Sequence, residues 1–310
     1  MAAVCDILNS NEVNVQIQTT SVCTAKCIMC PYMESWHRDN PGLMSDELFD
    51  RILEQISALK VKKICPYLEN EPLADRRIYD RITKIRKMFP DALIEVSTNA
   101  LALSNENAEK LLSVLCDGKH EIWISFHGMN KRTHEGIMGL PFEKCFANVI
   151  NLLKEGEKYN ANIKLRGAGM GRTSELKHDF QFEKAQYVDF WNSAFKKFNI
   201  KNTPGLNFFT YHDRAGSIKR NSIRIDKIIR PNLENFSCVR LNNWLHFLYT
   251  GELILCCMDY HRETVFGNIL NHSLEEIINS RDYEGLHGSV TGKVDSPKDF
   301  ICKRCISPGG

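Results

Sequence analysis

The sequence lacks long apolar runs, and its charges of opposite sign almost cancel. No apolar stretch in the 310 residues approaches the roughly 20 that cross a bilayer, so we expect no membrane partner. The first residues lack the basic region and apolar core of a secretory signal. A formal net charge of +2 argues against a strongly basic surface that would bind nucleic acid. These absences predict a cytoplasmic protein that binds neither membranes nor nucleic acid.

The chain also has no glycine-rich phosphate loop, no internal repeat beyond a β/α rhythm and no low-complexity tract. Nothing in the sequence therefore favours a nucleotide as the substrate. The chain does, however, contain 12 cysteines. A disulfide framework with that many cysteines is typical of small secreted chains, and this chain is neither small nor visibly secreted.

The first two-thirds of the chain alternates strand-like apolar runs with amphipathic helical segments. The first helical segment is typical, because Ser45 can cap it while Leu48 and Ile52 begin an apolar face. The expected strands are Val13–Thr19, Lys63–Leu68, Leu93–Thr98, Glu121–Phe126, Asn162–Ala168 and Leu206–Tyr211. Six strand–helix units predict an α/β fold with a parallel sheet, and they are too few to close an eight-stranded barrel. We expect a partial, open (β/α)6 TIM-like barrel over residues 1–212.

The remainder of the chain breaks this rhythm. A polar connector is expected over 213–235, followed by a small α+β domain over 236–310. Its expected elements are a hairpin formed by Trp244–Tyr249 and Leu253–Cys257, a short helix at Ser273–Ser280 and a loop-rich tail. So small a domain builds little core, and a metal cluster would stabilise it.

Seven cysteines form two separated groups, and they are the main candidates for metal ligands. The first group lies in a loop after the first strand, at the edge of the sheet where β/α proteins have their active sites. Three thiolates can hold three irons of a [4Fe-4S] cube and leave the fourth iron open, whereas four thiolates can hold a cube completely. Zinc is the alternative for each group, although near the first only His37 offers a fourth ligand. The groups are Cys23, Cys27 and Cys30, and then Cys238, Cys256, Cys302 and Cys305.

The C-x3-C-x2-C motif, followed by β/α repeats, resembles the radical S-adenosylmethionine (radical SAM) superfamily. Three later strand ends match in order: Leu68–Leu73 resembles the family's Gly-Gly-Glu-Pro motif, Ser97–Ala100 its Ser-Thr-Asn-Gly, and Ile124–Gly128 its Ser-Phe/Leu-Asp-Gly. The resemblance implies a cluster whose open iron binds S-adenosylmethionine. Reductive cleavage would then yield a 5′-deoxyadenosyl radical that abstracts a substrate hydrogen. The resemblance also implies an external electron donor such as flavodoxin or ferredoxin.

The resemblance assigns six residues to S-adenosylmethionine. Met29 would pack against adenine, Glu71 would accept a hydrogen bond from the methionyl ammonium, and Arg166 would pair with the methionyl carboxylate or form only a strand-end ion pair. Asn99 and Ser125 would contact the ribose or the carboxylate. The full set is Met29, Asn70, Glu71, Asn99, Ser125 and Arg166.

Glu69, Asn70 and His127 depart from the family's motifs. Glu69 and Asn70 replace glycines, and the turn is expected to survive because asparagine tolerates left-handed backbone. Glu69 would then face the substrate. His127 replaces an aspartate.

The second cysteine group resembles the auxiliary-cluster domain called SPASM, in its shorter Twitch form. With four ligands, this domain would hold one closed [4Fe-4S] cluster. Cys257 adjoins Cys256 in the sequence, and adjacent residues of a strand point to opposite sides, so Cys257 is not expected to share that cluster. Cys257 is then either a small buried hydrophobe or a hydrogen-atom donor.

Enzymes of this kind divide into small-molecule tailoring enzymes, such as aminocyclitol dehydrogenases and sugar epimerases, and maturases of peptides or proteins. The first strand is expected to begin near Val13, which leaves no room for a sizeable peptide-recognition module and favours a small polar, sugar-like or aminocyclitol-like substrate. A dehydrogenase needs a base and an electron acceptor, whereas an epimerase needs a thiol such as Cys257. The candidates for base or orienting groups are Glu69, His127, His212, Asp259 and Tyr260.

A non-catalytic protein that holds iron–sulfur clusters or zinc on the same fold is the alternative from another class. Glu71, Asn99 and Ser125 argue against it, because a scaffold would not need residues that serve S-adenosylmethionine.

Overall fold

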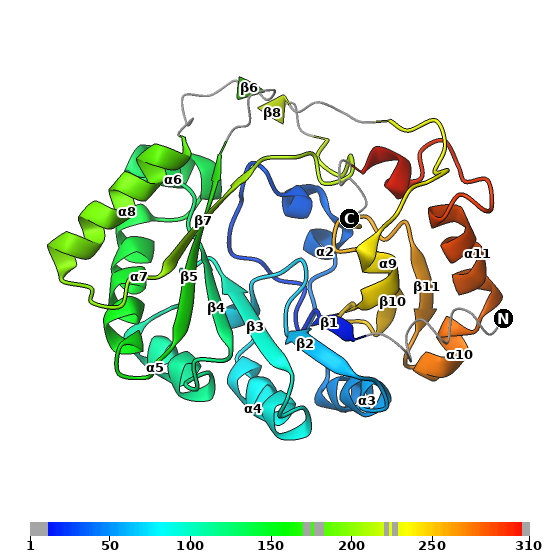
Figure 1. Cartoon of the computed structure of the whole chain (residues 1–310), viewed down its shortest axis with the longest axis horizontal. Coiled ribbons are helices and arrows are strands. Elements are labelled where there is room, and N and C mark those ends of the chain that lie inside the picture. Colours follow the sequence, from blue (N-terminus) through cyan, green and yellow to red (C-terminus); the bar gives the residue numbers. More distant parts are fainter. Residues whose placement is uncertain (1–11, 170–174, 177–182, 220–222, 225–228, 306–310) are drawn as a thin grey trace.

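The main feature of the computed structural model is a nine-stranded sheet. The structure describes residues 12–169, 175–176, 183–219, 223–224 and 229–305. Six strands are parallel and adjacent in chain order, as predicted: β1 (Val13–Ile17), β2 (Val61–Cys65), β3 (Leu93–Thr98), β4 (Glu121–Ser125), β5 (Asn162–Gly169) and β7 (Gly205–Thr210). The sheet is curved and its edges do not meet (Figure 1), so the open α/β barrel is confirmed.

The connecting helices lie along the outer side of the curved sheet (Figure 1). They are α3 (Asp46–Ile56), α4 (Ile78–Met88), α5 (Asn105–Val114), α6 (Lys131–Met138), α7 (Phe142–Gly156) and α8 (Lys184–Phe198). The first of them begins as predicted, since the Ser45 hydroxyl accepts a hydrogen bond of 3.1 Å from the Leu48 amide. Its apolar face, which includes Leu48 and Ile52, is buried against the sheet in the main core. Burial of these helix faces is what stabilises the strands in this order.

The C-terminal part of the chain continues the same sheet. Strand β9 (Trp244–Phe247) pairs in parallel with β1, and β10 (Glu252–Ile254) and β11 (Val265–Asn268) follow in antiparallel order. Gly251 makes the turn between β9 and β10 with φ of +84°, a conformation that suits glycine. The hairpin is therefore present, but it is fused to the barrel edge. The proposed domain limits at 213 and 236 stay predictions.

The tail contains more helix than expected. After α9 (Val239–Asn243), the predicted short helix is α10 (Leu274–Ile278), capped by Ser273. A second helix, α11 (Arg281–Val290), follows where the sequence favoured loops. Gly285 and Gly288 lower the helical propensity of that segment, yet packing of Tyr283 and Val290 in the interior stabilises it.

The other described elements are short. They are η1 (Pro31–Glu34), α2 (Trp36–Asp39), η2 (Pro72–Ala74), β6 (Glu175–Leu176), β8 (Ile223–Arg224) and η3 (Ile301–Arg304). None of the helices in the described ranges is long and apolar enough to cross a membrane.

Candidate active site

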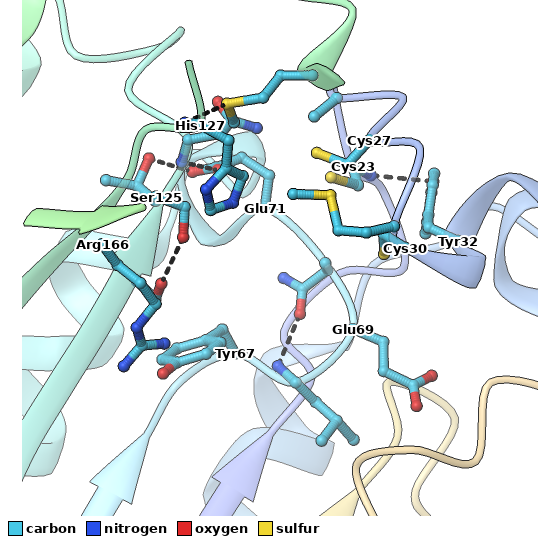
Figure 2. Close-up of a pocket in the computed structure, with 18 of the residues that line it drawn as sticks. Cys23, Cys27, Cys30, Tyr32, Tyr67, Glu69, Glu71, Ser125, His127 and Arg166 are labelled. Atoms are coloured by element: carbon cyan, nitrogen blue, oxygen red, sulfur yellow. Dashed lines mark hydrogen bonds between the residues drawn. The ribbon is translucent and has the colours of Figure 1, made fainter. Parts of the chain in front are cut away.

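A cavity of about 180 Å³ opens at the carboxyl ends of the parallel strands. Cys23, Cys27 and Cys30 form one wall, and Ser125, His127 and Arg166 lie on the opposite side (Figure 2). All six residues expected to hold S-adenosylmethionine line it: Met29, Asn70, Glu71, Asn99, Ser125 and Arg166. Motifs far apart in the sequence therefore meet because every strand of a parallel sheet ends at the same edge.

The loop that carries the three cysteines is held by backbone hydrogen bonds. Lys26 and Ile28 donate to the carbonyls at the end of α6, at 2.8 and 2.9 Å, and the Cys23 amide donates to the Tyr32 hydroxyl at 2.9 Å. Burial raises the pKa of the Cys23 thiol well above its usual range, and the nearby Glu71 adds to the rise. Bound iron would offset both effects, because a metal ligand must be a thiolate.

Glu71 connects the end of β2 to the end of β3. Its carboxylate accepts hydrogen bonds from the Thr98 hydroxyl at 2.6 Å, the Asn99 amide at 2.8 Å and the Leu73 amide at 3.2 Å. Burial raises the pKa of Glu71 to about 7, although these three bonds oppose the rise. The expected contact with the methionyl ammonium stays a prediction, and the residue already has a structural role.

The two asparagines also organise the loops. The Asn99 side-chain amide donates to the Thr24 hydroxyl at 3.0 Å, which connects β3 to the cysteine loop. The Asn70 side chain accepts from the Leu68 amide at 2.9 Å. Asn70 is not among the described residues with positive φ, so the expectation that it supplies a left-handed turn is wrong. The left-handed residue is Ala100, with φ of +66°, where the family's motif has glycine.

Arg166 carries a charge without a carboxylate partner in the part of the chain that the structure describes. Its guanidinium carbon lies 4.0 Å from the centroid of the Trp123 ring, which orients the group by a cation–π contact. The alternative of a strand-end ion pair is thus not observed among the described residues. An anion at the cavity wall, such as the methionyl carboxylate, suits this arrangement.

Glu69 forms a buried pair with His37. The Glu69 Oε2 and His37 Nε2 atoms are 2.6 Å apart, and neither side chain is exposed. Burial raises the pKa of Glu69 to about 7, while the contact with His37 opposes the rise. Glu69 lines the cavity, whereas His37 does not. His37 is thus occupied by Glu69 and not by the cysteine loop, which removes the one local candidate for a fourth zinc ligand.

The other catalytic candidates separate into two sets. His127 and Tyr260 line the cavity. Burial lowers the pKa of His127 to about 3, so this side chain is neutral, and the Tyr260 hydroxyl is hydrogen-bonded to the Cys30 sulfur at 3.6 Å. Asp259 lies outside the lining, and its carboxylate accepts bonds from the Glu263 and Thr264 amides at 2.8 and 2.7 Å. Asp259 therefore holds a turn.

Cys257 also lies outside the described lining, and it packs against Leu68, Leu248 and Ile254. Strand β10 ends at Ile254, so the expectation that residues 256 and 257 alternate across a strand is wrong. The adjacent Cys256 side chain lowers the pKa of the Cys257 thiol.

The second cysteine group packs on a small core of its own. Residues such as Leu241, Leu255 and Ile301 form this core. All four candidate ligands lie within it or against it: Cys238, Cys256, Cys302 and Cys305. Across the described ranges, no three His, Cys, Asp or Glu side chains converge as they would on one metal ion.

A second cavity, of about 390 Å³, adjoins the first and lies toward the second cysteine group. Arg166, Phe209 and Arg214 line both cavities, and Arg240 and Met258 bring the C-terminal part of the chain to the second one. His212 also lines it. Of these contributors, the sequence singled out Arg166 and His212.

Fold and site together define a class: an enzyme with an open β/α barrel, a three-cysteine loop at the strand ends and a separate four-cysteine region. A model of the radical SAM superfamily matches residues 17–166, and one of the SPASM iron–sulfur cluster-binding domain matches residues 238–306. The chain belongs to the radical SAM superfamily. Its two domains imply S-adenosylmethionine and [4Fe-4S] clusters as cofactors, and the cysteines in both regions fit that assignment.

Solved structures share this fold. BtrN in complex with AdoMet and 2-DOIA has a TM-score of 0.56 at 15% identity, covering 96% of this chain and 94% of BtrN. Streptococcus suis SuiB bound to the precursor peptide SuiA has a TM-score of 0.66 at 12% identity, covering 98% of this chain and 73% of SuiB. The enzyme anSMEcpe with AdoMet and the Cp18Cys peptide has a TM-score of 0.60 at 16% identity, covering 96% and 86%. Among curated sequences nothing matches.

Proposed function

We propose that the enzyme abstracts a hydrogen atom from a small polar substrate and oxidises it with the help of the second cluster. The observation that carries this proposal is the pair of adjoining cavities between the two cysteine groups. The larger cavity, of about 390 Å³, lies at the lower end of the range for small-molecule sites. A sugar-like or aminocyclitol-like molecule in it would reach toward the first cavity past Phe209.

The residues of the first cavity would hold S-adenosylmethionine. Arg166 and Ser125 would bind its carboxylate end, Met29 would pack against its adenine, and Asn99 would contact its ribose. When bound, the first cluster and S-adenosylmethionine supply a group that abstracts hydrogen, and the second cluster supplies an electron acceptor.

The chain itself must then accept a proton, because an alcohol that becomes a carbonyl also loses its hydroxyl hydrogen. Glu69 is the base that we propose, since it belongs to the cavity lining, contacts His37 at 2.6 Å and has a pKa of about 7. A base with a pKa near the working pH is the most effective one. His127 is neutral but too weakly basic, with a pKa of about 3.

The position of Cys257 favours oxidation over epimerisation. An epimerase would need a thiol that can give a hydrogen atom to the substrate, and Cys257 lies outside the described lining of both cavities. It packs instead among Leu68, Leu248 and Ile254.

A peptide or protein substrate is the second candidate. It is favoured by the likeness to SuiB and anSMEcpe, whose solved structures hold peptides. A maturase would turn over a peptide and ignore free sugars and aminocyclitols, whereas the enzyme proposed above would do the opposite.

Anaerobic reconstitution tests the proposal. We expect about eight irons per chain, and 5′-deoxyadenosine formed from S-adenosylmethionine when dithionite is added. Zinc in place of iron, without any cleavage, would contradict the enzyme and favour a metal-binding scaffold.

A further inference from the structure

Three arginines from distant parts of the chain converge on the second cavity. Arg166 comes from β5, Arg214 from the segment after β7, and Arg240 from α9. Within the described residues no Asp or Glu lines this cavity, and none forms an ion pair with any of the three guanidinium groups. Like charges gathered in a partly buried cavity repel one another unless an anion lies among them.

The positive charges of two of these arginines affect the pKa of His212, which lines the same cavity. Burial, together with the charges of Arg214 and Arg240, lowers the pKa of His212 to about 4. The Arg214 amide donates to His212 Nδ1 at 3.2 Å, so the neutral ring helps to hold the arginine segment. The aromatic residues Trp123, Phe208 and Phe209 complete the wall.

The backbone at Arg214 is strained in a way that serves this arrangement. Arg214, Ala215 and Gly216 have φ values of +52°, +55° and +75°, so two non-glycine residues in a row are left-handed. Such a conformation is unfavourable for a residue with a side chain and recurs at ligand sites. Packing holds it in place here, since Ala215 is buried in the small C-terminal core.

The second cysteine group balances only part of this charge. Arg240 follows Cys238 by two residues along the chain. Among the described residues, the Arg214 guanidinium makes a long contact, of 3.7 Å, with the Met258 sulfur, and the Arg166 guanidinium lies over the Trp123 ring. A charge of the bound substrate is the remaining counterpart.

We propose that the second cavity binds an oxyanion group of the substrate, a phosphate or a carboxylate, between Arg214 and Arg240. Arg166 lines both cavities and binds the carboxylate of S-adenosylmethionine. The rest of the substrate extends past Phe209 toward the first cavity. This inference rests on the proposed function and narrows its substrate class to anionic small molecules.

Isothermal titration tests it on the reconstituted protein, saturated with S-adenosylmethionine and without reductant, so that the cofactor's own carboxylate site is filled. Inorganic phosphate and acetate are titrated separately. We expect at least one of them to bind, and Arg214→Gln and Arg240→Gln each to weaken that binding about tenfold or more. Tighter binding of phosphate would identify the substrate's anionic group as a phosphate, and tighter binding of acetate would identify it as a carboxylate.

Arg76→Gln is the matched control, because Arg76 is exposed and lines neither cavity, and it should leave the affinity unchanged. Arg214→Lys should restore part of the binding, and the iron content of each variant shows that its clusters are in place. Binding of neither ion, or equal affinity in all variants, would overturn the oxyanion site. Formation of 5′-deoxyadenosine by the wild type reports on the proposed function independently.

Discussion

The two cysteine regions of the molecule are built in opposite ways. Cys23, Cys27 and Cys30 occupy one short loop, whose backbone is bonded to the end of α6 and to the Tyr32 hydroxyl. In the second region, Cys238 precedes α9, Cys256 follows β10, and the last two cysteines lie in or next to η3. The first region rests on the main core, whereas the second has only a small core of its own.

The difference indicates what each region needs from its metal. Contacts within the protein position the first loop, so iron there adds chemistry to a site that is already organised. The second region brings together segments that are more than sixty residues apart over little buried apolar surface, so iron there also stabilises the fold. The following predictions test this contrast in order of decreasing effect.

Removing a ligand of the first loop should abolish the reaction but not the fold. We expect Cys23→Ala to reduce 5′-deoxyadenosine formation to background and to lower the iron content from about eight to about four per chain. Cys116→Ala is the control, because Cys116 is an exposed thiol. Loss of both clusters in Cys23→Ala would show that the two regions depend on each other.

Glu69→Gln should separate the start of the reaction from its completion. The variant should still form 5′-deoxyadenosine, while oxidised product falls by about 10²–10⁴-fold, since glutamine cannot accept the proton. Glu54→Gln, at an exposed position, should have no effect. An equal loss of both products would instead assign Glu69 to cofactor binding.

The same residue predicts the pH dependence. Glu69 works as a base only when ionised, so product formation should fall about tenfold per pH unit below a pKa of about 7. The raised pKa also means that its contribution to stability is present below about 4.5 and lost as the pH rises through 7. Infrared spectra should show buried carboxylic acids that titrate near pH 7, from Glu69 and Glu71, and Glu69→Gln should remove one of them.

Iron removal should loosen the second region more than the first. Hydrogen exchange of the apoprotein should show amide protection reduced by about 10-fold or more across residues 238–305, with β1 to β5 little changed. The reconstituted protein is the reference. Equal loss of protection in both regions would refute the idea that the first loop is organised without metal.

The smallest effect is expected at Gly251, which makes the turn between β9 and β10. A Cβ atom there would lie 2.9 Å from Asn268 Oδ1 and 3.1 Å from Leu48 Cδ1, and φ is +84°. We expect Gly251→Ala to lower the free energy of unfolding by about 1–2 kcal/mol, measured by urea denaturation. Gly285→Ala is the control: its Cβ meets nothing within 4 Å, and alanine should stabilise α11 by about 0.5–1 kcal/mol.

Much of the fold and half of the site follow from local patterns. Strands such as β3 and β4 were predicted within a residue, because period-two and helical periodicities are short-range properties of the chain. The residues expected to hold the cofactor line one cavity because they follow strands, and parallel strands all end at one edge.

The rest depended on contacts between distant segments. Packing decides that β9 pairs with β1. Packing also stabilises helix α11, whose glycines made a helix hard to predict from the sequence. The pair of His37 and Glu69 follows no spacing rule, because the direction of each side chain is set only in the folded chain.

By itself, then, the sequence determined the open α/β barrel, the two cysteine groups and the superfamily, because these depend on periodicity and on short motifs. Only the tertiary structure decided that Cys257 lies away from the cavities, that Glu69 is buried against His37 and that Arg166, Arg214 and Arg240 line one cavity. The physical reason is that charge and burial act through distance in space, and that distance is fixed only once the strands are paired and the helices packed.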